Sequence, residues 1–333
     1  MAGQPDALQS EEMSVSLHGA LSIPKTEVSL TMDRSTVFLA LVFVLLWNSG
    51  FIGAEYGLSH AGPFALLLWR YLALTLILFI VLLLRKRFRW TGWPSAATNM
   101  SVGILAHGVW LSCVLLAQDQ NVPVGIVALV VALQPLATGA FSGMVTGERT
   151  PLQSWIGLLV GFGGVALTVL SRIDFSDSGS VFGYLIPLGS VMAITAASLI
   201  QRKTELKQDH KQLPVDLSLF YQSLGTAVVL VIPAVFIENL ETQWAAEFIY
   251  TMLWLIFAVS LGAYAFMWML IKRIDATRVA SLFYLGPPVT MLMAWIAFGD
   301  TLLLMDIIGL VVVLTGVLLT HIKLRKFPAG STK

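Results

Sequence analysis

Long apolar runs, separated by short polar connections, dominate the chain. Each run has about 18–24 residues, which is enough for a helix to cross a hydrocarbon core of about 30 Å. The runs predict ten spans, at residues 36–54, 63–84, 97–117, 123–145, 152–170, 180–201, 215–237, 248–271, 277–298 and 302–321. Helix breakers such as Pro94, Pro151 and Pro214 lie in the connections. The pattern therefore predicts an all-α membrane protein with ten transmembrane helices.

The basic residues test this count independently, because Lys and Arg gather in the cytoplasmic loops of membrane proteins. With a cytoplasmic N-terminus, the inner segments hold 18 of the 20 Lys and Arg residues. Arg172 falls in an outer loop, and Arg70 lies inside a span. Removing or adding a span scrambles this separation. We therefore expect a multi-pass membrane protein with both termini cytoplasmic, in the inner or plasma membrane if the source is bacterial.

The second half of the chain repeats a pattern of the first half, 152 residues later. Pro135, Gly147, Glu148, Gly157 and Gly164 recur as Pro287, Gly299, Asp300, Gly309 and Gly316. About five spans fit in this distance, so the second copy enters the bilayer upside down, as in many secondary transporters. This predicts two inverted five-helix repeats, at 36–171 and 180–322, between a disordered cytoplasmic tail at 1–35 and a basic cytoplasmic tail at 323–333. Met32 is an alternative to Met1 as the translation start.

Composition excludes several classes of protein. Hydrophobic residues make up 57% of the chain and charged residues 12%, whereas soluble domains carry about 25% charged residues. Cys113 is the only cysteine, so no intrachain disulfide can form. The sequence has no H-E-x-x-H motif, no P-loop and no Cys/His ligand cluster. We therefore expect neither an enzyme nor ATP-driven transport, and no cofactor, metal or nucleic acid.

Motifs in several spans, taken in order, point to a known family. Trp47-Asn48-Ser49 lies in the first span, Pro63 and Arg70 in the second, and Pro135 with Gly147-Glu148 is repeated as Pro287 with Gly299-Asp300. Over residues 36–322 the chain resembles the drug/metabolite transporter superfamily, EamA branch. The resemblance implies two five-helix halves, a central cavity and the movement of a small metabolite, often outward. One departure is that Gln222 stands 152 residues after Arg70, so the second half lacks this charge.

Polar and aromatic residues at mid-membrane depth are the candidates for lining the cavity. At 1.5 Å per residue, Asn48, His107 and Gln134 are roughly 15–18 Å deep. Asn48 either binds substrate or joins two helices, and Gln134 either faces the cavity or satisfies carbonyl groups freed by Pro135. His107 either binds substrate and relays a proton or bonds to a neighbouring helix. The predicted cavity residues are Trp47, Asn48, His107, Trp110, Gln134, Tyr264 and Tyr284.

Other charged and helix-breaking residues have predicted roles outside the cavity. Arg70 and Glu55 are expected to form an ion pair near the outer surface, either structural or gating. Pro135 and Pro287 are predicted to bend spans four and nine. Glu148 and Asp300 each precede a span and are predicted to cap the following helix. Gly157 and Gly161 predict a close helix–helix contact at span five.

These observations favour a secondary transporter that exports a small organic metabolite by alternating access. No carboxylate lies in the middle of a predicted span, which disfavours a pump for permanent cations and favours neutral, zwitterionic, amino acid-like or aromatic substrates. The expected partners are the substrate and the lipid bilayer, and His107 is the candidate for proton coupling. A passive channel or facilitator is one alternative; a membrane-embedded enzyme or a lipid-handling protein is another.

Overall fold

The computed structural model describes residues 33–147, 152–176, 178–206, 213–274, 279 and 281–321. Most of the predicted N-terminal tail with Met32, the predicted cap Glu148, and the C-terminal tail at 323–333 lie outside the described residues. The chain divides into two compact units, Met1–Val37 and Phe38–Lys333. Apart from the first residues of α2, all the helices of the described residues belong to the second unit.

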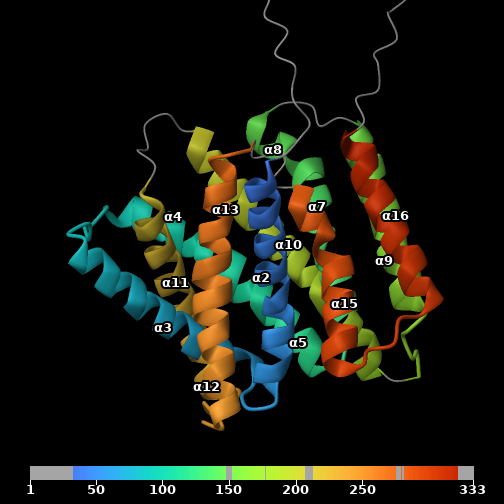
Figure 1. Cartoon of the computed structure of the whole chain (residues 1–333), viewed down its shortest axis with the longest axis horizontal. Helices are drawn as coiled ribbons and strands as arrows, with labels where there is room; N and C mark the ends of the chain where they lie inside the picture. Colours follow the sequence, from blue (N-terminus) through green and yellow to red (C-terminus); the bar gives the residue numbers. More distant parts are fainter. Residues whose placement is uncertain are drawn as a thin grey trace, which may run out of the picture. The chain divides into compact units, whose positions relative to one another are not determined.

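Helices account for nearly all of the regular structure in the described residues, which contain no β-strand and only one isolated bridge, between Ala61 and Thr242. In chain order (Figure 1) the helices are α2 Arg34–Leu58, α3 Pro63–Leu84, α4 Trp93–Gly103, η1 Ile104–Val109, α5 Trp110–Asp119, α6 Val124–Val131, α7 Gln134–Phe141, α8 Gly143–Thr146, α9 Leu152–Leu170, α10 Ser178–Leu206, α11 Val215–Phe236, α12 Ala246–Leu253, η2 Trp254–Ala263, α13 Tyr264–Ile271, η3 Phe283–Leu285, α15 Gly286–Phe298 and α16 Leu304–His321.

Eight helical stretches in the described residues are long and apolar enough to cross a membrane. They correspond to the first eight predicted spans, with α4, η1 and α5 joined into one stretch and α12, η2 and α13 into another. The predicted ninth and tenth spans correspond to two shorter apolar helices, Phe283–Phe298 and Leu304–Leu319. The all-helical architecture of a membrane protein is therefore confirmed.

Two of the long stretches contain a π-helical segment. Segment η1 occupies residues 104–109 of the third stretch, and η2 occupies residues 254–263 of the eighth. A shift of 152 residues moves η1 to 256–261, inside η2. The π-helix is rare, occurs mostly as a short bulge inside an α-helix, and is frequent at functional sites. The two segments therefore mark equivalent positions in the chain as candidates for function.

The duplicated prolines and glycines also occupy matching positions in the structure. Pro135 lies in the first turn of α7 and Pro287 in the first turn of α15, where a missing backbone N–H costs little. Helix α6 ends at Val131, so the fourth stretch is interrupted just before Pro135. Gly147 and Gly299 follow the ends of α8 and α15 with φ of +72° and +73°. This left-handed conformation favours glycine.

Helices α9 and α16 lie side by side (Figure 1) and approach each other closely through glycines. A Cβ atom on Gly164 would stand 2.7 Å from the carbonyl oxygen of Gly309, and one on Gly316 would stand 2.6 Å from that of Gly157. The shift of 152 residues turns one of these pairs into the other. The contact is thus self-complementary, as in a twofold interface.

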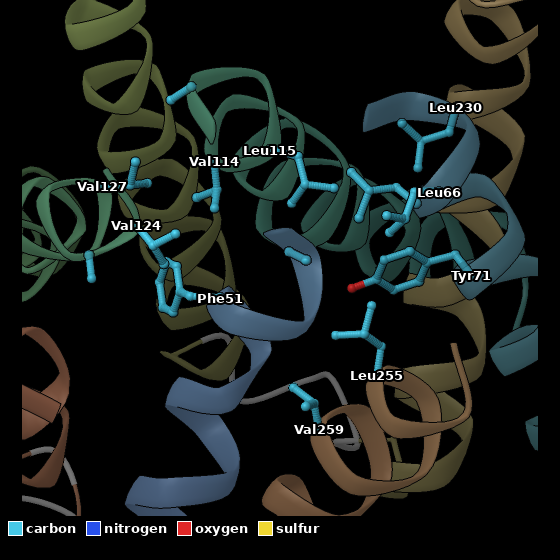
Figure 2. Packing of buried hydrophobic residues seen from close by; sticks show 14 of the residues in the cluster. Phe51, Leu66, Tyr71, Val114, Leu115, Val124, Val127, Leu230, Leu255 and Val259 are labelled. Carbon is cyan, nitrogen blue, oxygen red and sulfur yellow. The ribbon is translucent and has the colours of Figure 1, made fainter. Parts of the chain in front are cut away.

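The largest cluster of buried side chains joins α2, α3, α5, α6, α11 and η2. Figure 2 shows the ring of Tyr71 from α3 among Leu66, Leu115 and Leu255. Phe51 of α2 belongs to the same cluster. This packing holds the helices that surround the cavity described below.

The α9–α16 contact predicts different effects of substitution at two adjacent glycines. Gly164→Ala should lower the free energy of unfolding by about 1–3 kcal/mol, because the new methyl group meets the backbone of α16. Gly163→Ala should leave it unchanged or raise it by up to about 1 kcal/mol, because nothing lies within 4 Å of the new atom and alanine favours the helix. Unfolding in detergent micelles measures both, and a Gly164→Ala variant as stable as the parent would contradict the close approach.

Candidate functional site

A cavity lined mainly by aromatic and aliphatic side chains lies among α2, α3, η1, α5, α11, η2 and α13. The volume open to the centre of a water molecule is about 60 Å³. We call it the aromatic cavity. Its aromatic and polar lining residues are Trp47, Phe51, Arg70, Tyr71, His107, Trp110, Ser223, Ser260 and Tyr264. Both π segments contribute to it, through His107 and Ser260.

A second cavity, of about 370 Å³ on the same measure, lies beside the first. We call it the polar cavity, since its lining includes Ser95, Thr98, Asn99, Ser198, Gln201, Thr204, Glu205, Ser218 and Gln222. These residues come from α4, the C-terminal part of α10 and the start of α11. His107, Leu219 and Tyr264 line both cavities. These three side chains therefore mark where the aromatic and polar cavities meet.

Arg70 is buried in the wall of the aromatic cavity, with 6% of its surface exposed. Its Nε and Nη2 donate to the hydroxyl oxygen of Ser260, at 3.1 and 2.9 Å. Its guanidinium carbon lies 5.8 Å from the centre of the Tyr71 ring, within the range of a cation–π contact. These hydrogen bonds to the Ser260 hydroxyl join α3 to η2, the second π segment.

The predicted partner of Arg70 was wrong. In the part of the chain that the structure describes, Arg70 forms no ion pair with Glu55. Glu55 lies in the last part of α2, and its buried Oε2 has no hydrogen-bond partner. Depth along the membrane suggested the pairing, but Arg70 points to η2. A gating role for Glu55 and Arg70 remains a prediction.

His107 begins a chain of hydrogen bonds that leads into the polar cavity. Its Nε2 lies 3.2 Å from Gln222 Oε1, and because an amide oxygen only accepts, Nε2 donates. Gln222 Nε2 in turn donates to Ser218 Oγ at 3.1 Å, and Ser218 Oγ donates to Asn99 Oδ1 at 2.7 Å. The ring of His107 also stacks on Tyr71, with 5.5 Å between centroids.

Three of the four predicted aromatic residues, all except Tyr284, reach the same cavity from both halves of the chain. Trp47 and Tyr264 are in ring contact, with centroids 5.6 Å apart, and Trp110 contributes from the start of α5. Trp47, Arg70, His107, Trp110 and Tyr264 are therefore brought together. Whether these residues bind substrate stays a prediction.

Three predicted cavity residues line neither cavity. Asn48 donates from Nδ2 to Val44 O at 2.7 Å and accepts from Thr290 Oγ1 at 3.1 Å. Of the two roles predicted for Asn48, this geometry matches the joining of two helices, α2 and α15. Gln134 is half-buried at the start of α7, and Tyr284 is half-buried in η3 against the main core.

Tyr71, Ser260 and Gln222 were missed as site residues. Tyr71 stands next to Arg70 in the sequence, which is a weak signal for it. Gln222 is 152 residues from Arg70, so the duplication could have found it. Ser260 is a single hydroxyl in an apolar run, and no sequence pattern distinguishes it.

The loop between α11 and α12 is bonded to α3, close to the turn between α2 and α3. We call the contact made by Glu238 of this loop the Glu238 clasp. The carboxylate of Glu238 accepts from the backbone N–H groups of Phe64 and Ala65, at 3.0 and 2.7 Å. It thereby satisfies two free donors at the start of α3. Burial raises the pKa of Glu238, and these two hydrogen bonds act against that rise. Trp69 Nε1 also donates to Thr242 in the same loop, at 3.0 Å.

A buried ion pair joins the α9–α10 loop to α16. Arg172 bonds to both carboxylate oxygens of Asp306, and Asp306 raises the pKa of Arg172. The side chain of Asp306 is 0% exposed and also accepts from the N–H of Leu303 at 2.7 Å. Asp306 thus caps α16, whereas Asp300 accepts from the N–H of Val124 at the start of α6. The prediction that Asp300 caps the following helix was wrong.

Comparison with known proteins identifies the class. The model of the EamA-like transporter family matches the chain twice, at residues 34–170 and 181–322. This is a helical, multi-pass membrane protein of the transporter class. The chain belongs to the EamA-like transporter family, within the drug/metabolite transporter superfamily.

Individual relatives extend over nearly the whole chain. "Uncharacterized transporter YvbV" of Bacillus subtilis is 29% identical over 303 residues, covering 88% of this chain and 93% of the relative. "Probable amino-acid metabolite efflux pump" of Salmonella typhimurium is 24% identical over 294 residues, covering 86% and 94%. One solved structure, titled only "Crystal structure of protein", matches with a TM-score of 0.58 and 19% identity, covering 86% of this chain and 96% of that one. It supports the fold alone.

The Arg172–Asp306 pair predicts a large loss of stability on removal of one partner. Arg172→Met should lower the free energy of unfolding by about 3 kcal/mol, because Asp306 is left as a buried, uncompensated charge. Arg202→Met is the matched control, since its pair with Glu205 is exposed and 3.7 Å long, and should change it by less than about 1 kcal/mol. Thermal unfolding of the two purified variants measures the difference, and equal losses would contradict a structural role for the buried pair.

Proposed function

We propose that this protein is a secondary transporter that exports a small organic metabolite, amino acid-like or aromatic, by alternating access. The observation that carries the proposal is the aromatic cavity, formed by helices from both halves of the chain and bordered by both π segments. Membership of a transporter family supports it. Under this proposal the protein is not an enzyme, and it uses no nucleic acid partner or cofactor.

Ten membrane-crossing helices in two inverted repeats, 36–171 and 180–322, are part of the proposal. Three structural features recur at a spacing of 152 residues: the π segments, the prolines that start α7 and α15, and the left-handed glycines. The self-complementary contact of α9 with α16 supports a twofold relation between the halves. Inverted repeats place a substrate site near the middle of the membrane.

The two cavities suggest which conformation the structure represents. The polar cavity lies beside Arg202 and Lys203 at the end of α10, and basic residues favour the cytoplasmic side. The opposite end carries the Glu238 clasp and the Arg172–Asp306 pair. We propose that this is a state open to the cytoplasm through the polar cavity, with both termini on that side. His107 is the candidate for proton coupling, since its hydrogen bonds lead through Gln222 towards Asn99.

The inverted arrangement predicts the sidedness of two equivalent loops. Arg87 and Asn239 are both exposed and are 152 residues apart, so they must face opposite sides of the membrane. In a Cys113→Ala background, a membrane-impermeant maleimide should label Asn239→Cys on intact cells. It should label Arg87→Cys only after the cells are permeabilised. Labelling of both from the same side would refute the inversion.

Counterflow tests the carrier mechanism. Proteoliposomes preloaded with unlabelled aromatic amino acids should accelerate the uptake of the same labelled compounds, whereas a passive channel should not. Trp110→Ala and Tyr264→Ala should reduce this uptake about tenfold or more, because burial of an aromatic side chain against a ligand contributes about 1.5–3 kcal/mol.

Trp93→Ala is the control for these variants, since Trp93 is 74% exposed at the start of α4 and lines neither cavity. It should transport at the parent rate. Equal uptake with and without preloading, in protein that has kept its fold, would favour the channel.

A further inference from the structure

We propose that Arg70 binds the carboxylate of the transported compound, and that the substrate is a small monocarboxylate with an apolar or aromatic body. This inference rests on the proposed transport function and names the substrate class for the same cavity. It is carried by the bonding of Arg70, by its counterpart in the second half, and by the chemistry of the cavity wall.

Arg70 is a buried cation whose donors are largely uncommitted. A guanidinium group has five N–H donors, and the two that bond within the protein share one neutral hydroxyl, that of Ser260. No carboxylate of the described residues lies within ion-pair distance of Arg70. A buried charge normally has a charged partner. An anion entering the cavity would supply that partner.

The second half of the chain shows that the charge is not needed to join the helices. Gln222 occupies the position equivalent to Arg70, on α11, and bonds to His107 in the first π segment. Arg70, on α3, bonds to Ser260 in the second π segment. A neutral amide therefore makes the same kind of bridge. The positive charge of Arg70 needs a different explanation, and ligand binding provides one.

The cavity wall defines the rest of the ligand. Among the described residues, those around the aromatic cavity include Trp47, Tyr71, Trp110 and Tyr264 but no aspartate or glutamate. An apolar or aromatic body would pack against these rings. An ammonium group would find no carboxylate, only the ring faces that accept cations. One fixed positive charge beside an apolar wall thus matches one carboxylate per ligand, with or without an amino group.

Paired ligands and paired variants test this assignment. The probes are indole-3-acetate and indole-3-acetamide, which differ in the group that would meet Arg70. Binding to the purified protein in detergent is measured by isothermal titration calorimetry and by the shift in thermal midpoint. The parent should bind the acetate about 10- to 100-fold more tightly than the amide, as expected for loss of a charged hydrogen-bond partner. In Arg70→Gln this preference should disappear, and in Arg70→Lys it should be partly kept.

Arg87→Gln is the matched control, because Arg87 has 61% of its side chain exposed, and it should keep the full preference. If Arg70→Gln fails to fold, the preference of the parent alone decides the question. Equal affinity for acetate and amide in the parent, binding of neither, or an undiminished preference in Arg70→Gln would overturn the inference. Counterflow distinguishes failure of this inference from failure of the proposed transport function. Transport without a preference for the carboxylate would contradict only the inference. Binding that depends on Arg70, without counterflow, would contradict only the carrier mechanism.

Discussion

Backbone hydrogen bonds have no water to replace them inside a bilayer, so any departure from a regular helix must be covered by protein. In the described residues, two kinds of departure recur in both halves of the chain. Two π segments border the aromatic cavity, and the interrupted turns before Pro135 and Pro287 precede α7 and α15. Helices of both halves must pack around these sites for the chain to be stable in lipid. The same packing creates the enclosed space in which a ligand can bind.

Polar side chains divide between holding the fold and facing the cavity. Asn48 and Thr290 tie α2 to α15, Glu238 holds the start of α3, and Arg172 with Asp306 ties the α9–α10 loop to α16. Each of these groups has its partners within the protein. Arg70 differs because its one hydrogen-bond partner, Ser260, leaves three of its five donors unused. This contrast is the reason for proposing that Arg70 binds a ligand, whereas the other residues have structural roles.

The sequence predicted the depth of a residue in the membrane better than the side of its helix on which the side chain lies. Depth follows from the rise of 1.5 Å per residue, and it placed Trp47 and His107 at similar heights, where the structure brings them together. Arg70 was expected nearer the outer surface and outside the cavity, whereas the structure places it in the wall of the same cavity. Direction depends on packing between helices. Asn48 therefore turned out to face α15 although its neighbour Trp47 faces the cavity. The position of Ser260 in the cavity wall could not be predicted from regular helical spacing, because a π segment changes which residues of a helix share a face.

Helices α9 and α16 contribute no side chain to either cavity. Their glycine contact is therefore separate from the residues that would contact a ligand. Substitutions at distant sites without shared partners have nearly additive effects on stability. Cavity residues could thus diversify over evolutionary time without a compensating change at the glycine contact. A fold of this kind can therefore come to bind different compounds through successive substitutions in the cavity.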